Sequence, residues 1–334
     1  MAFTDATVAP PPAPIRDPRA RDRTRYCWRV PRIAYLGPEG TFTEAALLKM
    51  TAAGVVPSAG ELQPEPAEST PAALEAVRSG AAEFACVPIE NSIEGSVLPT
   101  LDSLAGGPPL QIYAELTLEV SFSIVVRPGV VPEQVHSVAA FPVAAAQVRR
   151  WLAAHLPGAA VVPANSNAAA ALDVVAGRAD AGVSTALAAQ RYGLSVLAGD
   201  VVDEPNARTR FVLVGRPGAP PGRTGADRTS VVLRIDSAPG ALVSAMNEFG
   251  IRDIDLTRIE SRPTRTGLGT YVFFLDCVGH IDDSAVAEAL KALYRRCADV
   301  RYLGSWPTGA AAGAVPPQLD DADRWLTRLR NGGL

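Results

Sequence analysis

Histidine and cysteine are scarce in this chain of 334 residues, and neither sign of charge is in large excess. The three histidines, His136, His155 and His280, stand at unrelated positions, which leaves almost no material for a histidine metal site or a Ser-His-Asp triad. The formal net charge of −4 gives no basic footprint for nucleic acid, and no uninterrupted apolar run is long enough to cross a membrane. Chemistry must therefore come from carboxylates, hydroxyls and amides that act on a small molecule.

Cysteine usage and the N-terminal composition indicate where the protein works. Of the four cysteines, Cys27, Cys86, Cys277 and Cys297, none is paired at a metal-binding spacing, and Cys86 and Cys277 lie inside apolar strand patterns. This is typical of reduced, packed thiols in a cytoplasmic protein. Residues 1–31 combine a proline cluster with alternating Arg and Asp and contain no apolar signal-peptide core, which predicts a disordered leader.

Strand and helix patterns alternate from Arg32 onward. A strand at 32–36, a glycine turn at 37–43, helices at 44–48 and 71–79 and a strand at 84–87 predict a first α/β lobe. Two long strands, 111–120 and 121–126, are suited to crossing into a second lobe, which includes a helix from Pro142 to His155. The chain returns through residues 200–214. We predict a two-lobed α/β domain over residues 32–215, with lobe one at about 32–110 and 198–215, lobe two at about 111–197, and a cleft between them.

A segment rich in glycine and proline, residues 216–228, predicts a linker to a second domain. Residues 229–305 then follow the order β-α-β-β-α-β, which is typical of a ferredoxin-like α+β domain. The C-terminal tail, 306–334, contains one short amphipathic segment around Trp325–Leu329.

The stretch Val87–Ser96 is the strongest candidate for a functional site. It follows a buried strand and places an acid, an amide and a hydroxyl in succession at Glu90, Asn91 and Ser92. Polar groups at the end of a strand in an α/β sheet commonly bind a small molecule, although a turn with Ser92 or Ser96 as a helix cap is the alternative. The glycine turn before residue 44 adds a backbone that is receptive to anions.

Six motifs occur in one order along the chain: 35–43 (YLGPEGTFT), 88–92 (PIENS), 209–211 (TRF), 240–243 (GALV), 260–263 (ESRP) and 303–305 (LGS). Through them the chain, over roughly residues 32–306, resembles prephenate dehydratases that carry a C-terminal ACT regulatory domain. The resemblance implies a two-lobed catalytic domain like that of periplasmic binding proteins. It also implies an elimination in which prephenate loses carbon dioxide and water to give phenylpyruvate for phenylalanine biosynthesis, with no metal and no cofactor.

The resemblance assigns roles to residues of the first domain. Thr209 would contact the leaving hydroxyl, Asn91 would orient the substrate, and Glu90 would be a possible acid if its pKa is raised. Arg210 would either bind a substrate carboxylate or form a structural ion pair with Glu90 or Asp203. The remaining implied substrate contacts are Thr41, Ser92, Gln147, Ser166 and Phe211.

Two segments depart from the family pattern. Ala140-Phe141-Pro142-Val143 stands where the family has Ser-His-Pro-Gln, and Ser166-Asn167-Ala168 stands in place of Ser-Thr-Ala.

The second domain would bind phenylalanine between paired ACT domains of a homodimer or homotetramer. The implied effector residues are Gly240, Ala241, Leu242, Val243, Asp255, Glu260, Ser261, Arg262 and Pro263, with Asp255 replacing a frequent asparagine. Three alternatives stay open: arogenate as the substrate, a non-enzymatic amino-acid sensor, and an ACT domain that only dimerises.

Overall fold

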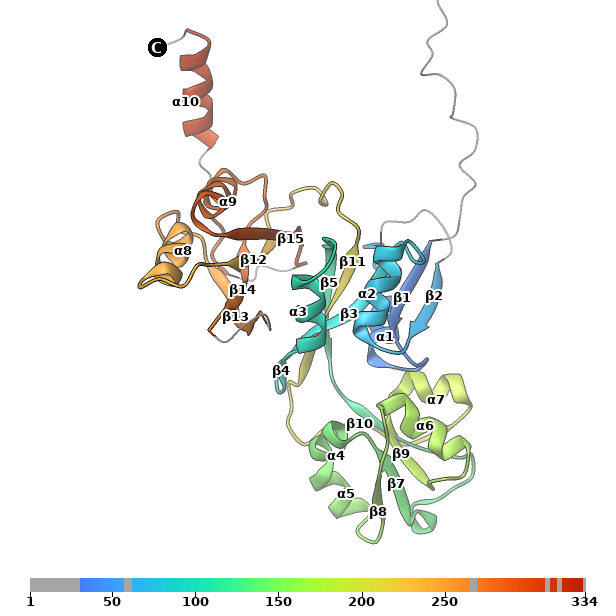
Figure 1. Cartoon of the computed structure of the whole chain (residues 1–334). Coiled ribbons are helices and arrows are strands. Elements are labelled where there is room, and N and C mark those ends of the chain that lie inside the picture. Colours follow the sequence, from blue (N-terminus) through green and yellow to red (C-terminus); the bar gives the residue numbers. More distant parts are fainter. Residues whose placement is uncertain (1–30, 57–61, 265–268, 310–312, 317–319, 333–334) are drawn as a thin grey trace, which may run out of the picture. The chain divides into compact units, whose positions relative to one another are not determined.

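The computed structural model describes residues 31–56, 62–264, 269–309, 313–316 and 320–332 (Figure 1). The described strands form three sheets, one in each α/β lobe and one in the C-terminal α+β part, which confirms the predicted fold class. The predicted leader and Cys27 lie outside the described residues, apart from Pro31. None of the described helices is both long and apolar enough to cross a membrane.

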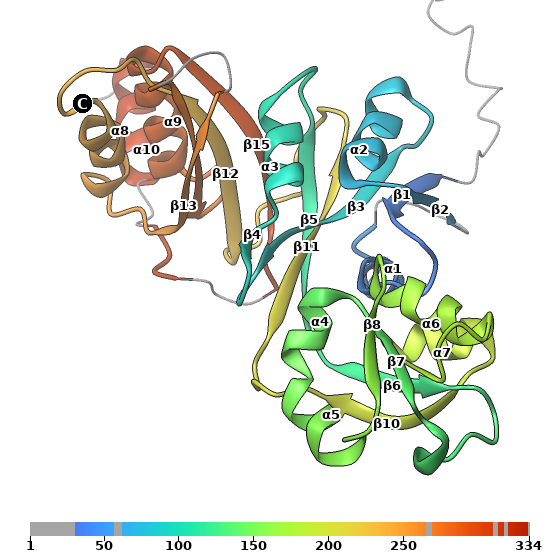
Figure 2. The same ribbon diagram turned by 60° about the horizontal axis from the view of Figure 1, so that its bottom comes forward.

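The first sheet has the strand order β2-β1-β3-β11-β5, with the short β4 paired to β3. Its strands are β1 (Arg32–Leu36), β2 (Gln63–Ala67), β3 (Phe84–Asn91), β4 (Gly95–Ser96), β5 (Gln111–Glu119) and β11 (Arg208–Gly215). Helix α1 (Phe42–Ala52) packs on one face, and α2 (Thr70–Ser79) and α3 (Leu98–Ala105) pack on the other (Figure 2). Strand β11 is antiparallel to both of its neighbours, β3 and β5.

The second sheet has the order β10-β6-β9-β7-β8. Its strands are β6 (Phe122–Val126), β7 (Ser137–Ala140), β8 (Ala160–Pro163), β9 (Ala181–Ser184) and β10 (Ser195–Val201). Its helices are the 3-10 turn η1 (Pro132–Gln134), α4 (Pro142–Gln147), α5 (Arg149–His155), α6 (Asn167–Val175) and α7 (Ala186–Tyr192). The helix expected over 142–155 is interrupted at Val148, whose φ of −122° and ψ of 11° are not helical.

The sheets correct the predicted lobe boundaries. Strand β5 pairs with β11 along its whole length and so belongs to the first sheet, whereas β10 belongs to the second. The crossing itself occurs where the two long strands were predicted to meet, between Val120 and Ser121. Residues 202–207 bring the chain back into β11.

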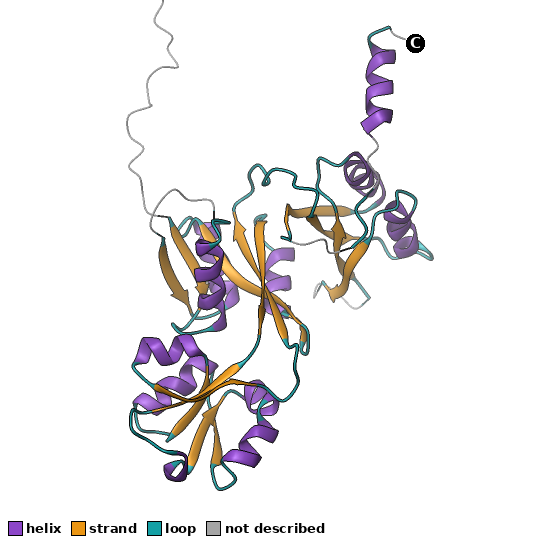
Figure 3. Ribbon diagram, turned by 180° about the vertical axis from the view of Figure 1, so that it is seen from behind, coloured by secondary structure: helices purple, strands orange, loops and turns teal. Residues whose placement is uncertain are grey.

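The third sheet has the order β13-β14-β12-β15, the arrangement of a ferredoxin-like fold. Its elements are β12 (Asp227–Arg234), α8 (Ala241–Gly250), β13 (Leu256–Pro263), β14 (Tyr271–Val278), α9 (Ser284–Arg296) and β15 (Asp299–Pro307). The amphipathic segment of the tail forms α10 (Asp320–Arg330). In Figure 3 the helices are coloured purple and the strands orange.

One hydrophobic core joins the first and third sheets. Phe274, Leu303 and Trp306 of the third sheet pack in the same cluster as Val212 and Val214 of β11. Gly304 allows this approach, because a Cβ built there would lie 2.3 Å from the backbone oxygen of Ile112 on β5, and its φ is +135°. The face of the first sheet that carries Val212 is therefore covered in part by the C-terminal domain.

Candidate active site

A bulge in β3 decides which side chains share a face near the end of the β3–β11 pair. Along β11 the register pairs Val212 with Val87 and Phe211 with Pro88, then skips Ile89, and pairs Arg210 with Glu90 and Thr209 with Asn91. Side chains of directly paired residues point to the same face of a sheet. Thr209 and Asn91 therefore lie on the α1 face, and Arg210 and Glu90 lie on the face toward the C-terminal domain.

The first of these pairs is joined by a hydrogen bond from Asn91 Nδ2 to Thr209 Oγ1 of 2.8 Å. The amide orientation is fixed, because Asn91 Oδ1 accepts hydrogen bonds from the backbone N–H groups of Ile93 (2.8 Å) and Glu94 (2.9 Å). Thr209 is 8% exposed and uses its oxygen as an acceptor, so its own proton stays available for donation.

Ser92 is hydrogen-bonded to Arg208, the first residue of β11. Its Oγ accepts from the backbone N–H of Arg208 at 2.9 Å, and its own N–H donates to the Arg208 oxygen at 2.8 Å. The structure thus brings Asn91, Ser92 and Thr209 together, as the sequence predicted for three of the site residues.

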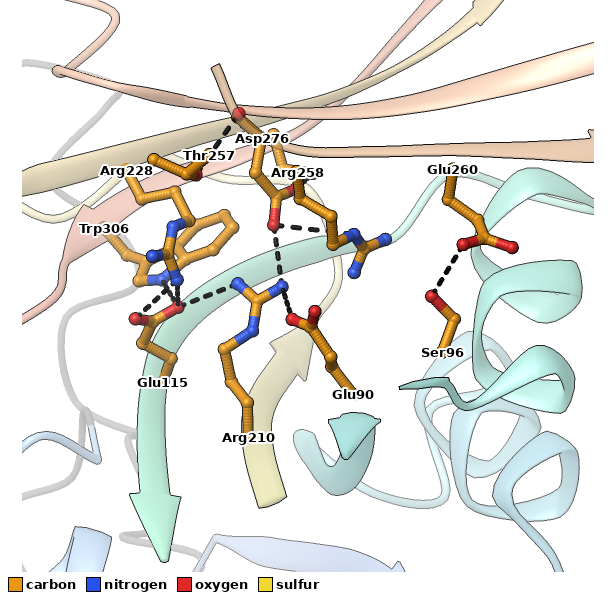
Figure 4. A network of polar contacts seen from close by, with 11 residues as sticks. Glu90, Ser96, Glu115, Arg210, Arg228, Thr257, Arg258, Glu260, Asp276 and Trp306 are labelled. Atoms are coloured by element: carbon orange, nitrogen blue, oxygen red, sulfur yellow. Dashed lines mark hydrogen bonds and ion pairs between the residues drawn. The ribbon is translucent and has the colours of Figure 1, made fainter. Parts of the chain in front are cut away.

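Glu90 and Arg210 lie on the face of β11 opposite to Thr209. Arg210 Nη2 lies 2.9 Å from Glu90 and 2.8 Å from Asp276, and Nη1 lies 3.2 Å from Glu115 (Figure 4). Of the alternatives for Arg210, the structure therefore has the ion pair with Glu90, whereas Asp203 pairs with Arg150. Because of the bulge, Glu90 faces away from Thr209 and is not placed to act as its acid.

The Arg210 ion pairs attach β11 to the C-terminal domain. Asp276 of β14 is 1% exposed and also accepts a hydrogen bond of 2.7 Å from Ser230. Burial raises the pKa of Asp276, but the charges of Arg258 and Arg210 outweigh it and lower this pKa to about 2. Sequence reasoning missed this residue, although an acid inside the apolar run 272–278 signals a buried charge that needs a partner.

Glu115 on β5 is the other buried acid of this junction. It accepts from Trp306 Nε1 at 3.0 Å and from Arg228 Nη1 at 2.7 Å. Burial disfavours the charged form of Arg210, but the carboxylates of Asp276, Glu115 and Glu90 outweigh it and raise the pKa of the guanidinium.

Gln147 and Ser166 come from the second lobe. Gln147 ends α4 and is 8% exposed, and its Oε1 is buried without a hydrogen-bond partner among the described residues. Its backbone oxygen accepts from the N–H of Asp203 at 2.7 Å, which holds the segment that leads into Thr209. Ser166 caps α6 by accepting from Ala169 N at 3.0 Å, so its hydroxyl proton is free.

Thr41 and Phe211, two of the implied substrate contacts, are both engaged in contacts within the protein. Thr41 caps α1, where its hydroxyl donates to Leu36 O and accepts from Glu44 N, so both roles of the hydroxyl are used. Glu44 Oε2 accepts a hydrogen bond of 2.6 Å from the Gly40 N–H, which occupies part of the predicted anion-receptive turn. Phe211 is 1% exposed in the core under α1, where it supports the strand.

The predicted effector residues occupy two places in the third sheet. Gly240 starts α8 with a φ of +76°, and Ala241 and Leu242 line a cavity of about 160 Å³ beside Tyr271. Glu260 accepts from Ser96 Oγ at 3.1 Å, and Arg262 pairs with Asp102 of α3 at 2.9 Å. Both side chains therefore contact the first lobe, while Ser261 and Pro263 stand beside them on β13.

Asp255 lies at the other end of this strand. Its backbone oxygen accepts from Val278, whereas Arg262 pairs with Val272, six residues along β14. Within one chain Asp255 is therefore separated from the start of α8 by most of the length of the sheet.

Comparison with known proteins identifies the family. A model of the family "Prephenate dehydratase" matches residues 33–219, and a model of the ACT domain matches residues 229–293. The chain belongs to the prephenate dehydratase family. The prephenate dehydratase of Mycobacterium sp. strain KMS is 75% identical over 307 residues, which cover 91% of this chain and 97% of that protein.

The similar solved structures include a prephenate dehydratase and also a protein that is named for a different reaction. The prephenate dehydratase of Arthrobacter aurescens, solved in complex with L-Phe, has a TM-score of 0.80 and 41% identity over 90% of this chain and 99% of its own. GqqA, named a novel type of quorum quenching acylase, has a TM-score of 0.73 and 28% identity over 83% of this chain and 98% of its own. A shared fold therefore does not fix the reaction, and the residues of the site have to carry that argument.

Proposed function

We propose that this chain converts prephenate to phenylpyruvate, carbon dioxide and water, with Thr209 at the leaving hydroxyl. The observation that carries this role is the oriented Asn91–Thr209 hydrogen bond. Since Asn91 donates to Thr209 Oγ1, the threonine O–H is polarised and its proton points toward a further acceptor. A substrate oxygen on the α1 face of β11 is that acceptor in our proposal.

The reaction needs this donor at one step. As the carboxylate leaves as carbon dioxide, the electron pair of its carbon–carbon bond enters the ring and the hydroxyl departs from the opposite ring carbon with its electron pair. The departing oxygen gains negative charge and takes up one proton from the solvent to become water. A threonine hydroxyl is too weak an acid to transfer its proton outright, so we assign it a hydrogen bond that strengthens as this charge develops.

The charge distribution around the two faces supports this assignment. Prephenate carries two carboxylates, and a carboxylate next to it would repel it. The bulge in β3 turns Glu90 to the opposite face, where Arg210 neutralises it, and leaves neutral Asn91 and Thr209 on the substrate face. In this proposal Asn91 and Thr209 are catalytic, and Glu90 and Arg210 are positioning residues.

The second lobe supplies the other substrate contacts in this proposal. The free hydroxyl proton of Ser166 stands at the N-terminus of α6, where backbone N–H groups favour a carboxylate. Gln147 Oε1 is buried and has no hydrogen-bond partner in the described part of the chain, so this amide can bind a polar group of the substrate.

Arogenate is the competing substrate, because it differs from prephenate by an amine in place of the side-chain ketone. Purified protein should form phenylpyruvate from prephenate faster than phenylalanine from arogenate, measured as kcat/KM for each under the same conditions. A higher kcat/KM for arogenate would make arogenate the substrate in place of prephenate. If the protein converts neither compound, the proposed reaction is wrong.

We further propose that phenylalanine regulates the enzyme through paired ACT domains. The A. aurescens relative was solved with L-Phe, and Gly240 and its neighbours start α8 here as a helix N-terminus suited to a carboxylate. Val243 (72% exposed), Ile259 (54%) and Tyr271 (45%) leave apolar surface on this domain, which favours pairing into a homodimer or homotetramer. Glu260 and Arg262 would then transmit the change to the first lobe through Ser96 and Asp102.

Isothermal titration with phenylalanine, combined with sedimentation velocity, tests this regulation. Wild type should bind phenylalanine, and Gly240→Asp should bind it at least tenfold more weakly, because an acid at the helix N-terminus repels the ligand carboxylate. Equal affinity in both proteins would place the effector elsewhere.

A further inference from the structure

The junction between the first sheet and the C-terminal domain has a cavity of about 240 Å³ that is lined by four arginines. Figure 4 shows three of them, Arg210, Arg228 and Arg258. Arg208 and Arg210 come from β11, Arg228 from β12 and Arg258 from β13. The cavity lies on the face of β11 opposite to Thr209, and neither Thr209 nor Asn91 lines it, so it is separate from the two groups that are catalytic in our proposal.

Several hydrogen-bond donors in this cavity have no acceptor among the described residues. Among the described residues, Nε of Arg210, Nε of Arg228 and all three guanidinium nitrogens of Arg258 are buried without a hydrogen-bond partner. The buried carboxylates Glu115 and Asp276 already accept hydrogen bonds on both oxygens. The cavity therefore calls for an acceptor that the described chain does not supply.

Arg258 is the clearest sign of an absent partner. Its side chain is 7% exposed, and its nearest carboxylate, Asp276, lies 3.8 Å from Nε, too far for a hydrogen bond. Figure 4 shows its terminal nitrogens on the side away from Asp276. A guanidinium that is desolvated without hydrogen bonds is costly, and its planar fork matches the two oxygens of an oxyanion.

The lining is rich in arginine, and its charges balance. Four arginines and three carboxylates, Glu90, Glu115 and Asp276, line the cavity, and the remaining positive charge, on Arg208, pairs with Glu119 beside it. Hydroxyls of Ser92, Thr117 and Thr257 complete a polar lining. The side chains of Glu90 and Arg208 are 40% and 54% exposed, so a small solute can enter beside them.

We propose that this junction cavity binds one small oxyanion, a carboxylate or phosphate, with Arg258 as its main hydrogen-bond donor. The ligand would lie between β11 and β13 and would accept the hydrogen bonds that the Arg258 guanidinium does not make to the described residues. It would therefore strengthen the attachment of the C-terminal domain to the strand that carries Thr209, whichever substrate the enzyme uses.

Thermal unfolding of the full chain in formate, in phosphate and in chloride at equal ionic strength tests the proposal. Formate or phosphate should raise the Tm of wild type by about 2–4 °C above chloride. Whichever anion acts identifies the class of ligand. The rise should be lost in Arg258→Gln and retained in Arg295→Gln, which removes an exposed arginine on α9.

Two further proteins separate this cavity from the reaction site. Thr209→Ala should keep the anion effect, and Arg258→Lys should keep it at higher anion concentration. No rise in wild type, an equal rise in Arg258→Gln, or a rise that disappears in Thr209→Ala would overturn the proposal.

A direct measurement does not depend on the folding of any variant. Crystals of wild type grown with selenate should show an anomalous peak beside the Arg258 guanidinium. Selenate bound at other sites with none in this cavity would also overturn the proposal.

Discussion

The two faces of the β3–β11 pair have opposite chemistry. On one face Thr209 and Asn91 are neutral and are joined by one oriented hydrogen bond. On the other face Arg210 and Glu90 are charged, and Arg210 contacts three carboxylates at the C-terminal domain. Because adjacent residues on one strand serve the two faces, the same rigid element can hold the reacting group and the regulatory domain.

This comparison predicts that substitutions on the two faces will separate in what they change. Neutral groups on the Thr209 face should alter rate with little effect on folding, since their removal leaves no buried charge without a partner. Charged groups on the Arg210 face should alter stability, since removal of one partner leaves buried charges uncompensated.

Thr209→Ala should produce the largest effect on rate. Loss of a hydrogen-bond donor to a charge that develops in the transition state reduces kcat by about 100- to 1000-fold. The free energy of unfolding should change by less than about 1 kcal/mol. Steady-state kinetics and urea unfolding measure the two quantities, and Thr209→Ser, which keeps the hydroxyl, should recover most of the rate.

A variant Thr209→Ala with full activity would remove Thr209 from the mechanism. If Thr209→Ala fails to fold, Thr209 is needed for stability, and the expected difference between the two faces of the β3–β11 pair is wrong.

Arg210→Gln should produce the largest effect on stability. It leaves Asp276 and Glu115 buried with less positive charge, so the free energy of unfolding should fall by about 3–5 kcal/mol. Arg208→Gln is the matched control, because Arg208 lies on the same strand and its ion pair with Glu119 is exposed. That change should cost less than about 1 kcal/mol in urea unfolding.

The opposite result would restore the other role considered for Arg210. If Arg210→Gln is as stable as Arg208→Gln but has a strongly raised KM for prephenate, then Arg210 binds a substrate carboxylate.

The sequence predicted the overall architecture well, because the signals that determine it are local. Apolar periodicity predicted the strands 111–126 and the order of elements from 229 to 305, which the structure confirms. Strand β2 was missed because its sequence, Gln63-Pro64-Glu65-Pro66-Ala67, lacks apolar alternation. It is an edge strand paired only to β1, a position that tolerates proline.

The faces of the site residues could not be predicted in the same way. Strict alternation from Val87 and Ile89 would place Asn91 on their face, toward α2 and α3, and Glu90 beside Thr209. The bulge at Ile89 reverses both placements. Pro88 signals an irregularity in this central strand, but it does not show which residue is skipped. Asp276 likewise finds one of its partners, Arg210, 66 residues away along the chain, and this contact depends on tertiary packing.

Asp276→Asn tests how much the Asp276 charge, on the Arg210 face, contributes to stability at different pH values. The folded-state pKa of Asp276, about 2, lies below the ordinary value of 3.8, so its ionisation stabilises the fold above about pH 4. This contribution, about 2 kcal/mol, is lost as pH falls from about 4 to 2. The difference in unfolding free energy between wild type and Asp276→Asn should therefore narrow over that range, measured by urea unfolding at several pH values. A difference that is constant from pH 6 to pH 2.5 would mean that the Asp276 charge contributes nothing.

Ser166→Ala should produce the smallest effect and would extend the comparison to the second lobe. Ser69 and Ser166 cap α2 and α6 in the same way. Each hydroxyl oxygen accepts a hydrogen bond from the backbone N–H three residues later in the chain, at 3.2 Å in α2 and 3.0 Å in α6. Either change to alanine should cost about 1 kcal/mol in urea unfolding, because each removes one cap. Only Ser166→Ala should also raise KM for prephenate, by about fivefold, since only Ser166 has a substrate contact in our proposal. An unchanged KM in both variants would make Ser166 a helix cap alone, and a raised KM in both would show that the effect comes from lost stability and not from a lost contact.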